Sequence, residues 1–559
     1  MKNKLSIFVC LTVLFSILMA ACGGTAVTQA PAVATEVPQV APTQPLVVAQ
    51  PTSAPAEATQ VPVEATQPPA TGGIKRGGKL TWSTGASPQN LDVWQSVANQ
   101  DMWSMVNVVE GLVRVNRTGD DMEGCVADKW TISDNGLEYT FHIRPGIKFS
   151  NGDPVTPEDI IFSLKYAMAT GPWKWLDSSM KDVVKVDGEN VKVILSSTYS
   201  PMLTVFGFIS NAIIPQKVFE AKGLDQFNKA PIGTGPFMIS DYIPNDHITL
   251  VRNPYYWDLG EDGQPLPYLD EIVVTQVPEP TTRVLQVQSG QTDATDNVNW
   301  SQVNELKNDP IADMQLWPST QTWYLIFNFK FPPMEDQNFR LALAYATDRQ
   351  AMVDAVLFGN GSVATTFFPE EGMCVDKTIT GFPYDVEKAK EYLAKSQYPT
   401  GFKGFRIEVP SGGGMARDIA TMLKDMWGKI GVEVDVQEVE NATLSDEFNS
   451  RTHYSISGYQ WTNDILDPDE QVGFFVVDPA YMTGWVNDQA IKAAKDAQLT
   501  FDNTERCKLY SDIQKIYNED SPVLNLYHTP FNTFVKKDVK GWSQINLGWY
   551  RFQYVWLDR

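Results

Sequence analysis

A strand–helix–strand pattern over residues 405–436 constrains the fold of this chain more than any other stretch. Residues 405–409 and 432–436 alternate apolar and polar side chains, as strands with one buried face do. Between them, residues 415–430 carry apolar side chains at helical spacing. Two strands joined by a helix pair in parallel through a right-handed crossover, which predicts an α/β fold. Ligands of such sheets bind beyond the carboxyl ends of the strands, where the loop 410–414 falls, although its three glycines also fit a flexible loop.

A second expected strand, over residues 454–459, leads into an acidic stretch. The pair Asp467-Pro468 predicts a turn that stops any strand. From residue 452 to residue 491 there is no Lys or Arg, and the acidic side chains there are Asp464, Asp467, Asp469, Glu470, Asp478 and Asp488. A carboxylate at the end of a strand, with no local cation, is free to receive a positive group from outside. The alternative is a solvated acidic loop.

The N-terminus has the pattern of an exported, anchored protein. Lys2 and Lys4 precede an apolar run over residues 5–21, which is short for a membrane span. The run ends in Leu-Met-Ala-Ala-Cys22, which resembles a bacterial lipobox, so residues 1–22 are expected to be a lipoprotein signal peptide with lipidation at Cys22. The alternative is an ordinary secretory signal with a chance cysteine. Residues 23–74 contain nine prolines and no Lys or Arg, which predicts a disordered tether.

Length and charge limit the remaining possibilities. A chain of 559 residues can form two or three domains with sizeable cores. Its 67 acidic and 44 basic residues give a net charge of −23. This charge excludes nucleic acid and electrostatic membrane binding, which both need an excess of Lys and Arg. The 16 tryptophans suit a binding cleft, because these rings cover much area at little entropic cost.

Motifs for catalysis or metal binding are missing from the sequence. The histidines form no HExxH and no close pair: they are His142, His247, His453 and His528. There is no GxSxG elbow and no GxxxxGK[ST] loop, so no enzyme activity, metal or cofactor is expected. Beyond the leader, Cys125, Cys374 and Cys507 allow either one bridge with a free thiol or three free thiols.

Further elements are expected near the start of the folded part. Residues 79–82 and 139–143 have the alternation of strands, and residues 100–112 are expected to form a helix. Thr156-Pro-Glu-Asp159 predicts a helix start, with a capping Thr, Pro at the first helical position and an acidic residue three after the cap.

The run VADKWTISDNGLEYTFHIRPGIKFSNGDPVTPEDIIFSLKYAM, residues 126–168, resembles the signature of periplasmic peptide-binding proteins, the extracellular receptors of dipeptide, oligopeptide and nickel ABC importers. The similarity continues in the order of the family over residues 75–559. Its further matches are residues 231–237, 250–257, 282–286, 336–349, 384–390, 401–402 and 527–528.

The resemblance implies a bilobal α/β fold of the periplasmic-binding-protein type (type II, large three-subdomain form) with hinge strands between the lobes. Lobe I would hold 75–111, 230–320 and 520–559, an extra subdomain 112–229, and lobe II 321–519. The implied function is a substrate-binding receptor of an ABC importer. It would capture peptides by lobe closure and deliver them to a permease that separate ATPase subunits drive. We expect a monomer, held outside the cytoplasm on the cell membrane by a lipid.

The resemblance also implies a ligand site. In the peptide receptors the residue that matches Asp464 holds the α-ammonium of the peptide, and the preceding strand pairs with the extended ligand. Trp461 would wall a side-chain pocket, and the other expected ligand contacts are Thr462, Asn463, Tyr459, Gly85 and Trp323. Dipeptide receptors use an arginine for the ligand carboxylate, but this chain has Pro410 at that place and Arg417 seven residues on. The departure favours longer peptides.

Other ligands stay open at this point. Relatives of this kind also bind oligosaccharides, and stacking faces for sugars could come from Trp82, Trp94, Trp103, Trp323 and Trp485. Four scattered histidines disfavour a nickel chelate. A tethered surface hydrolase or adhesin is the alternative of a different class.

Overall fold

The computed structural model describes residues 73–96, 98–477 and 483–559. The predictions for the signal peptide, for Cys22 and for all but the last two residues of the tether therefore lie outside the described residues. Within the described part, no helix has both the length and the apolar composition needed to cross a membrane.

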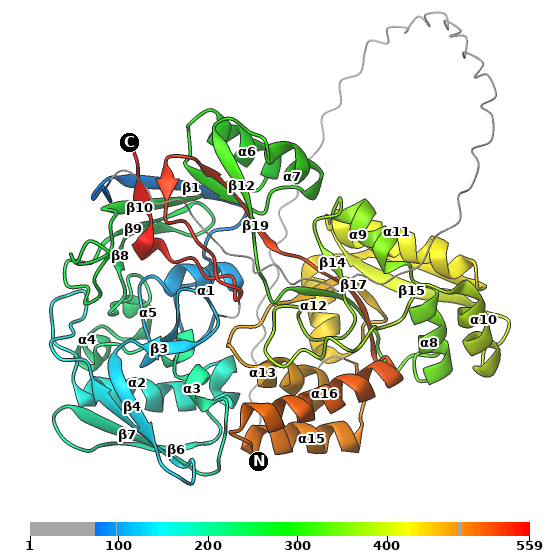
Figure 1. The fold of residues 1–559 in the computed structure, drawn as a ribbon, viewed down its shortest axis with the longest axis horizontal. Coiled ribbons are helices and arrows are strands. Elements are labelled where there is room, and N and C mark those ends of the chain that lie inside the picture. The colour runs from blue at the N-terminus through cyan, green and yellow to red at the C-terminus, as the bar shows by residue number, and fades with distance from the viewer. Residues whose placement is uncertain (1–72, 97, 478–482) are drawn as a thin grey trace, which may run out of the picture. The chain divides into compact units, whose positions relative to one another are not determined.

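A seven-stranded mixed sheet forms the first body, in the order β12-β19-β11-β1-β10-β9-β8 (Figure 1). The predicted strand at residues 79–82 is confirmed as β1, which pairs in parallel with β10 and β11. The strands are β1 (Lys79–Thr84), β8 (Phe237–Ile243), β9 (His247–Arg252), β10 (Glu271–Gln276), β11 (Ala294–Asp296), β12 (Ala312–Trp317) and β19 (Phe531–Lys536). The helices are α1 (Asn99–Met105), α6 (Pro280–Gln288) and α7 (Trp300–Leu306), and β20 (Val539–Lys540), η4 (Phe552–Tyr554) and β21 (Trp556–Leu557) close the chain.

The expected helix over residues 100–112 is shorter than predicted, because α1 ends at Met105. The carbonyl oxygens beyond it accept hydrogen bonds from distant parts of the chain instead of from the next helical turn. The oxygen of Asn107 accepts the N–H of Phe237 at 3.0 Å, and the oxygen of Glu110 accepts the N–H of Ile213 at 2.9 Å. Tertiary pairing therefore overrides the helical periodicity here.

A four-stranded antiparallel sheet, in the order β4-β5-β7-β6, follows. Its strands are β4 (Ala127–Ile132), β5 (Glu138–Ile143), β6 (Met180–Lys185) and β7 (Asn190–Leu195). Helix α2 (Pro157–Ala169) begins at the predicted capping box of Thr156 and Asp159. The remaining elements are β2 (Val113–Val115), β3 (Met122–Gly124), η1 (Pro172–Trp175), α3 (Met202–Val205), η2 (Ile209–Asn211), α4 (Gln216–Lys222) and α5 (Leu224–Phe227).

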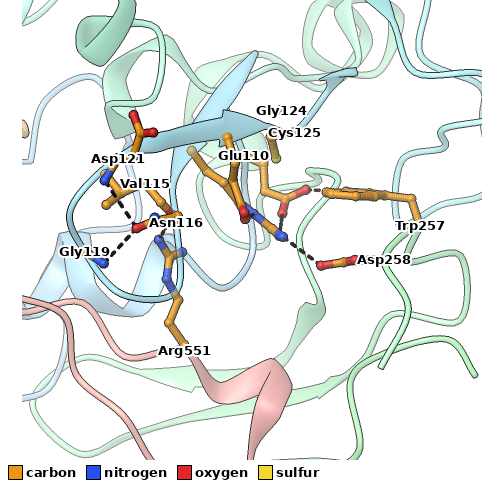
Figure 2. A network of polar contacts seen from close by, with 12 residues as sticks. Glu110, Val115, Asn116, Gly119, Asp121, Gly124, Cys125, Trp257, Asp258 and Arg551 are labelled. Atoms are coloured by element: carbon orange, nitrogen blue, oxygen red, sulfur yellow. Dashed lines mark hydrogen bonds and ion pairs between the residues drawn. The ribbon is translucent and has the colours of Figure 1, made fainter. Parts of the chain in front are cut away.

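A buried polar network ties the segment after α1 to the loop after β9 (Figure 2). The guanidinium of Arg114 contacts Glu123 at 2.6 Å, Asp258 at 2.7 Å and Glu110 at 3.5 Å. The indole N–H of Trp257 donates to Glu110 at 3.0 Å. Charged groups that are buried in this way need such partners. The network therefore anchors β2 and β3, which carry Arg114 and Glu123, to the loop after β9 of the seven-stranded sheet.

The second body is a six-stranded sheet in the order β14-β18-β13-β17-β15-β16. The predicted strand–helix–strand unit is confirmed: β15 and β16 pair in parallel and α11 joins them. The strands are β13 (Thr322–Ile326), β14 (Ser362–Val363), β15 (Phe402–Pro410), β16 (Val432–Val439), β17 (Ile456–Trp461) and β18 (Val523–His528). The helices are α8 (Gln337–Tyr345), α9 (Arg349–Val356), α10 (Val386–Lys395), α11 (Gly414–Gly428), α12 (Asn441–Ser450), α13 (Pro468–Val472), the π-helical turn η3 (Gly473–Val477), α15 (Asp488–Leu499) and α16 (Asn503–Asp520).

The chain crosses between the two large sheets at residues 318–321 and 529–530, which connect β12 to β13 and β18 to β19. The crossings are joined, since the N–H of Thr529 donates to the oxygen of Gln321 at 3.3 Å and Ser319 donates to the oxygen of Thr529. Because β18 lies in the six-stranded sheet, the topology favours a boundary near residue 529 rather than the predicted 520.

The cysteines take the first of the two arrangements that the sequence left open. Cys374 and Cys507 form a disulfide, which links the segment after β14 to α16, and Cys125 is free and buried. Burial raises the pKa of the Cys125 thiol well above its ordinary value.

Candidate functional site

A cleft of about 1430 Å³ is lined by residues of both large sheets and of the η1 segment. Drug-sized ligands occupy roughly 300–1,000 Å³, so the cleft has room for an oligomeric ligand. Aromatic rings dominate its walls. The tryptophans in contact with the cleft are Trp82, Trp103, Trp173, Trp175, Trp300, Trp323 and Trp461.

Two of the tryptophans that were considered as stacking faces lie elsewhere. Trp94 is 1% exposed within the core that the seven-stranded and four-stranded sheets share, and Trp485 is 3% exposed in the core beside α15 and α16. Their role is core packing, and that prediction was wrong. Trp173, Trp175 and Trp300 line the cleft without having been predicted, because no local pattern separates a wall tryptophan from a core tryptophan.

Strand β17 brings its carboxyl end into the cleft. It begins at Ile456, two residues later than predicted, and ends at Trp461, before the Asp-Pro pair. Tyr459, Trp461 and Thr462 line the cleft. The Trp461 ring packs against Phe474, with the ring centroids 4.7 Å apart.

Asp464 is the carboxyl group that the cleft reaches beyond this strand. Its residue is 7% exposed, and its Oδ1 atom has no hydrogen-bond partner among the described residues. Its backbone N–H donates to the carboxyl group of Glu470 at 2.8 Å, and the N–H of Ile465 donates to the same oxygen at 3.0 Å. The turn that holds Asp464 is thus built on a second acidic residue, which is fully buried.

The two carboxyl groups act as a pair. Burial raises the pKa of Asp464, and a hydrogen bond from Glu470 acts in the opposite direction. Burial also raises the pKa of Glu470 well above its ordinary value, and Coulomb repulsion from Asp464 adds to this rise. The protonated Glu470 therefore supports a negative charge on Asp464, and this charge faces the cleft.

Asp467 and Asp469 of the same stretch are paired inside the fold. Asp467 receives the guanidinium of Arg506 through contacts of 2.6 and 2.7 Å, and Asp469 accepts the hydroxyl of Tyr199 at 2.6 Å. Asp467 also caps α13. The solvated-loop alternative is therefore wrong for Asp464, Asp467 and Asp469, which are all buried. Arg506, the cation that pairs with Asp467, belongs to α16 and lies outside residues 452–491, which contain no Lys or Arg.

Of the remaining predicted ligand contacts, some line the cleft and others do not. Trp323 lines the cleft, and its indole N–H donates to Thr529 at 3.2 Å. Asn463 turns away from the lining: its backbone N–H donates to Thr320 at 3.0 Å, and its side chain accepts the indole N–H of Trp461 at 2.9 Å. Gly85 is also outside the lining, and a guanidinium nitrogen of Arg283 lies 3.3 Å from where a Cβ would be. The placement of Asn463 and Gly85 does not support a direct ligand contact.

No basic side chain lines the cleft among the described residues, whereas Asp296, Asp418 and Asp464 do. Arg417 pairs with Glu438 instead. In the described ranges there is no group of three or more His, Cys, Asp or Glu side chains that could hold a metal ion.

A bilobal α/β body with a large aromatic cleft and an acidic group inside it has the architecture of a solute-binding protein. The model of the bacterial extracellular solute-binding proteins, family 5 Middle, matches residues 121–482, which is more than half of the chain. The protein belongs to this family, whose members bind substrates outside the cytoplasm.

Individual relatives agree with this assignment. Heme-binding protein A of Haemophilus influenzae is 28% identical over 486 residues, which cover 81% of this chain and 88% of the relative. The probable D,D-dipeptide-binding periplasmic protein DdpA of Escherichia coli is 28% identical over 474 residues, with 82% and 89% covered.

Solved structures confirm the predicted fold. The periplasmic binding protein DppA of Helicobacter pylori, in complex with the peptide STSA, superposes with a TM-score of 0.77 at 24% identity, over 87% of this chain and 99% of that chain. HbpA2 of Haemophilus parasuis gives a TM-score of 0.73 at 26% identity, over 86% and 100%.

Proposed function

We propose that this protein is the peptide receptor of an ABC importer, and that Asp464 binds the α-ammonium group of the peptide. The observation that carries the proposal is the buried Asp464 carboxyl group, which faces a large cleft without a described cation near it. An ammonium group supplies the charge-assisted hydrogen bonds that such a carboxylate lacks. One relative is named a probable D,D-dipeptide-binding protein, and one similar solved structure is a complex with the peptide STSA. Both support a peptide ligand.

The open edge of β17 supports an extended peptide. One edge of this strand pairs with β13 from Ile456 to Trp461, but the other edge pairs with β15 only at Ile456. Gln460 and Trp461 therefore have no described strand pairing on that edge, and they border the cleft. A peptide that adds to this edge would gain backbone hydrogen bonds independent of its sequence.

An oligosaccharide is the second candidate, because the many tryptophan faces of the cleft suit sugar rings. Heme, the ligand in the name of one relative, is a poorer candidate. Its two carboxylates would meet no Lys, Arg or His among the described lining residues.

The wider proposal concerns transport. Closure of lobe I (75–111, 230–320 and the C-terminal segment) on lobe II would bury the ligand and present a surface to the permease, with residues 318–321 and 529–530 as the hinge. The extra subdomain would span 112–229. Lipidation at Cys22 would hold the monomeric receptor on the outer side of the cell membrane, and the receptor itself would catalyse no reaction.

Native mass spectrometry of the purified protein, followed by calorimetric titration, tests this function. We expect a co-purified mass that fits peptides, and binding of tri- to pentapeptides that N-acetylation weakens at least about tenfold. Binding of cello-oligosaccharides without binding of any peptide would overturn the peptide assignment in favour of the second candidate.

A further inference from the structure

A second buried carboxyl group borders the cleft on the side opposite to β17. Asp296 ends β11 in the seven-stranded sheet, lines the cleft and is 3% exposed. Its Oδ1 atom has no hydrogen-bond partner among the described residues. Its Oδ2 atom accepts two long hydrogen bonds, from the hydroxyl of Tyr550 and from the side chain of Asn297, both at 3.3 Å.

Burial raises the pKa of the Asp296 carboxyl group, and the charge of Arg283 lowers this pKa by a smaller amount. The guanidinium of Arg283 donates to backbone oxygens, those of Val277 at 2.8 Å, Pro278 at 3.0 Å, Asn297 at 3.0 Å and Asp296 at 3.2 Å. No ion pair joins Arg283 to the Asp296 carboxylate in the described part of the chain. Arg283 also lies outside the cleft lining, so it leaves the open side of Asp296 to the ligand.

Tyr550, which donates to this carboxyl group, packs against two tryptophans of the cleft wall. The ring of Tyr550 lies 4.8 Å from Trp82 and 6.2 Å from Trp103, measured between centroids. Trp82 and Trp103 line the cleft, and the indole N–H groups of both are buried without an acceptor among the described residues. Aromatic faces beside a carboxylate favour a cation, because the ring quadrupole and the negative charge act in the same direction.

The charge of the whole cleft points the same way. Its described lining has the carboxyl groups of Asp296, Asp418 and Asp464 and no basic side chain. The sequence at position 97 and at residues 478–482 also contains no Lys, Arg or His. An acidic side chain of a ligand would be buried against like charge, which is costly.

From this geometry we propose that the cleft selects peptides with a second positive charge, a Lys or Arg side chain held by Asp296 between the rings of Trp82 and Trp103. The inference rests on the proposed peptide function and adds a specificity to it. Asp464 serves the N-terminal ammonium and Asp296 the side chain, so the receptor prefers basic peptides and discriminates against acidic ones.

Calorimetric titration with a scanned peptide series tests the specificity. The series consists of C-terminally amidated tetra-alanine peptides in which Lys, norleucine or Glu replaces one residue at positions two to four. We expect one position at which Lys binds at least about tenfold more tightly than norleucine, because a charge-assisted bond replaces a purely apolar contact. At that position, Glu should bind more weakly than norleucine.

Asp296→Asn should abolish the preference for Lys over norleucine, so that the two peptides bind within about twofold of each other. Asp313→Asn is the matched control, since it removes the same charge from an exposed position of β12, outside the cleft lining. If norleucine binds as tightly as Lys at every position of the wild-type protein, the specificity is wrong while the peptide function stands. If no peptide of the series and no free-amino tri- to pentapeptide binds, the peptide function itself is refuted, and the specificity with it.

Discussion

Asp464→Asn is the most direct test of the candidate site. The substitution keeps the shape of the side chain and one acceptor oxygen, and it removes the charge that faces the cleft. A charge-assisted hydrogen bond contributes about 1.5–3 kcal/mol, which corresponds to a loss of affinity of roughly 10- to 150-fold. The upper part of this range applies here, because Asp464 is only 7% exposed and no basic group lines the described cleft to compete for it.

The assay is calorimetric titration of wild type and Asp464→Asn with a tripeptide and its N-acetylated form. Each change removes the same contact, so the two losses should not add in the double-mutant cycle. Asp435→Asn is the control, because it removes an exposed charge from β16 in the same sheet, outside the cleft. Peptide binding that is indifferent to both Asp464→Asn and N-acetylation would refute the ammonium role.

The same contact makes binding depend on pH. Burial raises the pKa of Asp464 in the ligand-free protein, and an ammonium group binds only its ionised form. As the pH falls through this raised pKa, the proton competes with the ligand, and the affinity should fall by up to about tenfold per pH unit. An affinity that stays constant between pH 8 and pH 5 would contradict the proposed charge on Asp464.

Further predictions concern the body and its anchor. Reduction of the Cys374–Cys507 disulfide should lower the free energy of unfolding by about 2–4 kcal/mol, seen as a lower Tm. The buried Cys125 should not react with a thiol reagent before the protein unfolds, and rapid labelling of the native protein would contradict this. Burial raises the pKa of Asp177 to about 7, so its contribution to stability is full at low pH and is lost as the pH rises through 7. The free energy of unfolding of Asp177→Asn, relative to wild type, should therefore be higher at pH 8 than at pH 4 by up to about 4 kcal/mol. Denaturant unfolding at the two pH values that reveals no such difference would refute the account. Cys22→Ser should release the protein from membranes without unfolding it, and a variant that stays in the salt-washed membrane pellet would exclude lipid anchoring.

Local patterns predicted the elements whose stabilising contacts are local or repeat along the chain. The alternation in residues 405–409 and 432–436 and the helix between them are reproduced by β15, β16 and α11. The capping box at Thr156 is also local, since both of its hydrogen bonds lie within three residues. The helix expected over residues 100–112 failed beyond Met105 because its carbonyl groups bond to residues more than a hundred positions away.

Sequence alone was enough to predict the class of protein, the parallel unit and the position of Asp464 at the end of a strand. Which acidic residues stay without an ion-pair partner depends instead on the tertiary structure. Asp467 receives Arg506 from α16, whereas Asp464 and Asp296 come to border one cleft from two different sheets. The physical reason is that burial and ion pairing depend on how distant elements pack, and neither leaves a periodic signal along the chain. The same packing placed Trp82 and Trp103 in the cleft wall and left Trp94 and Trp485 in the cores.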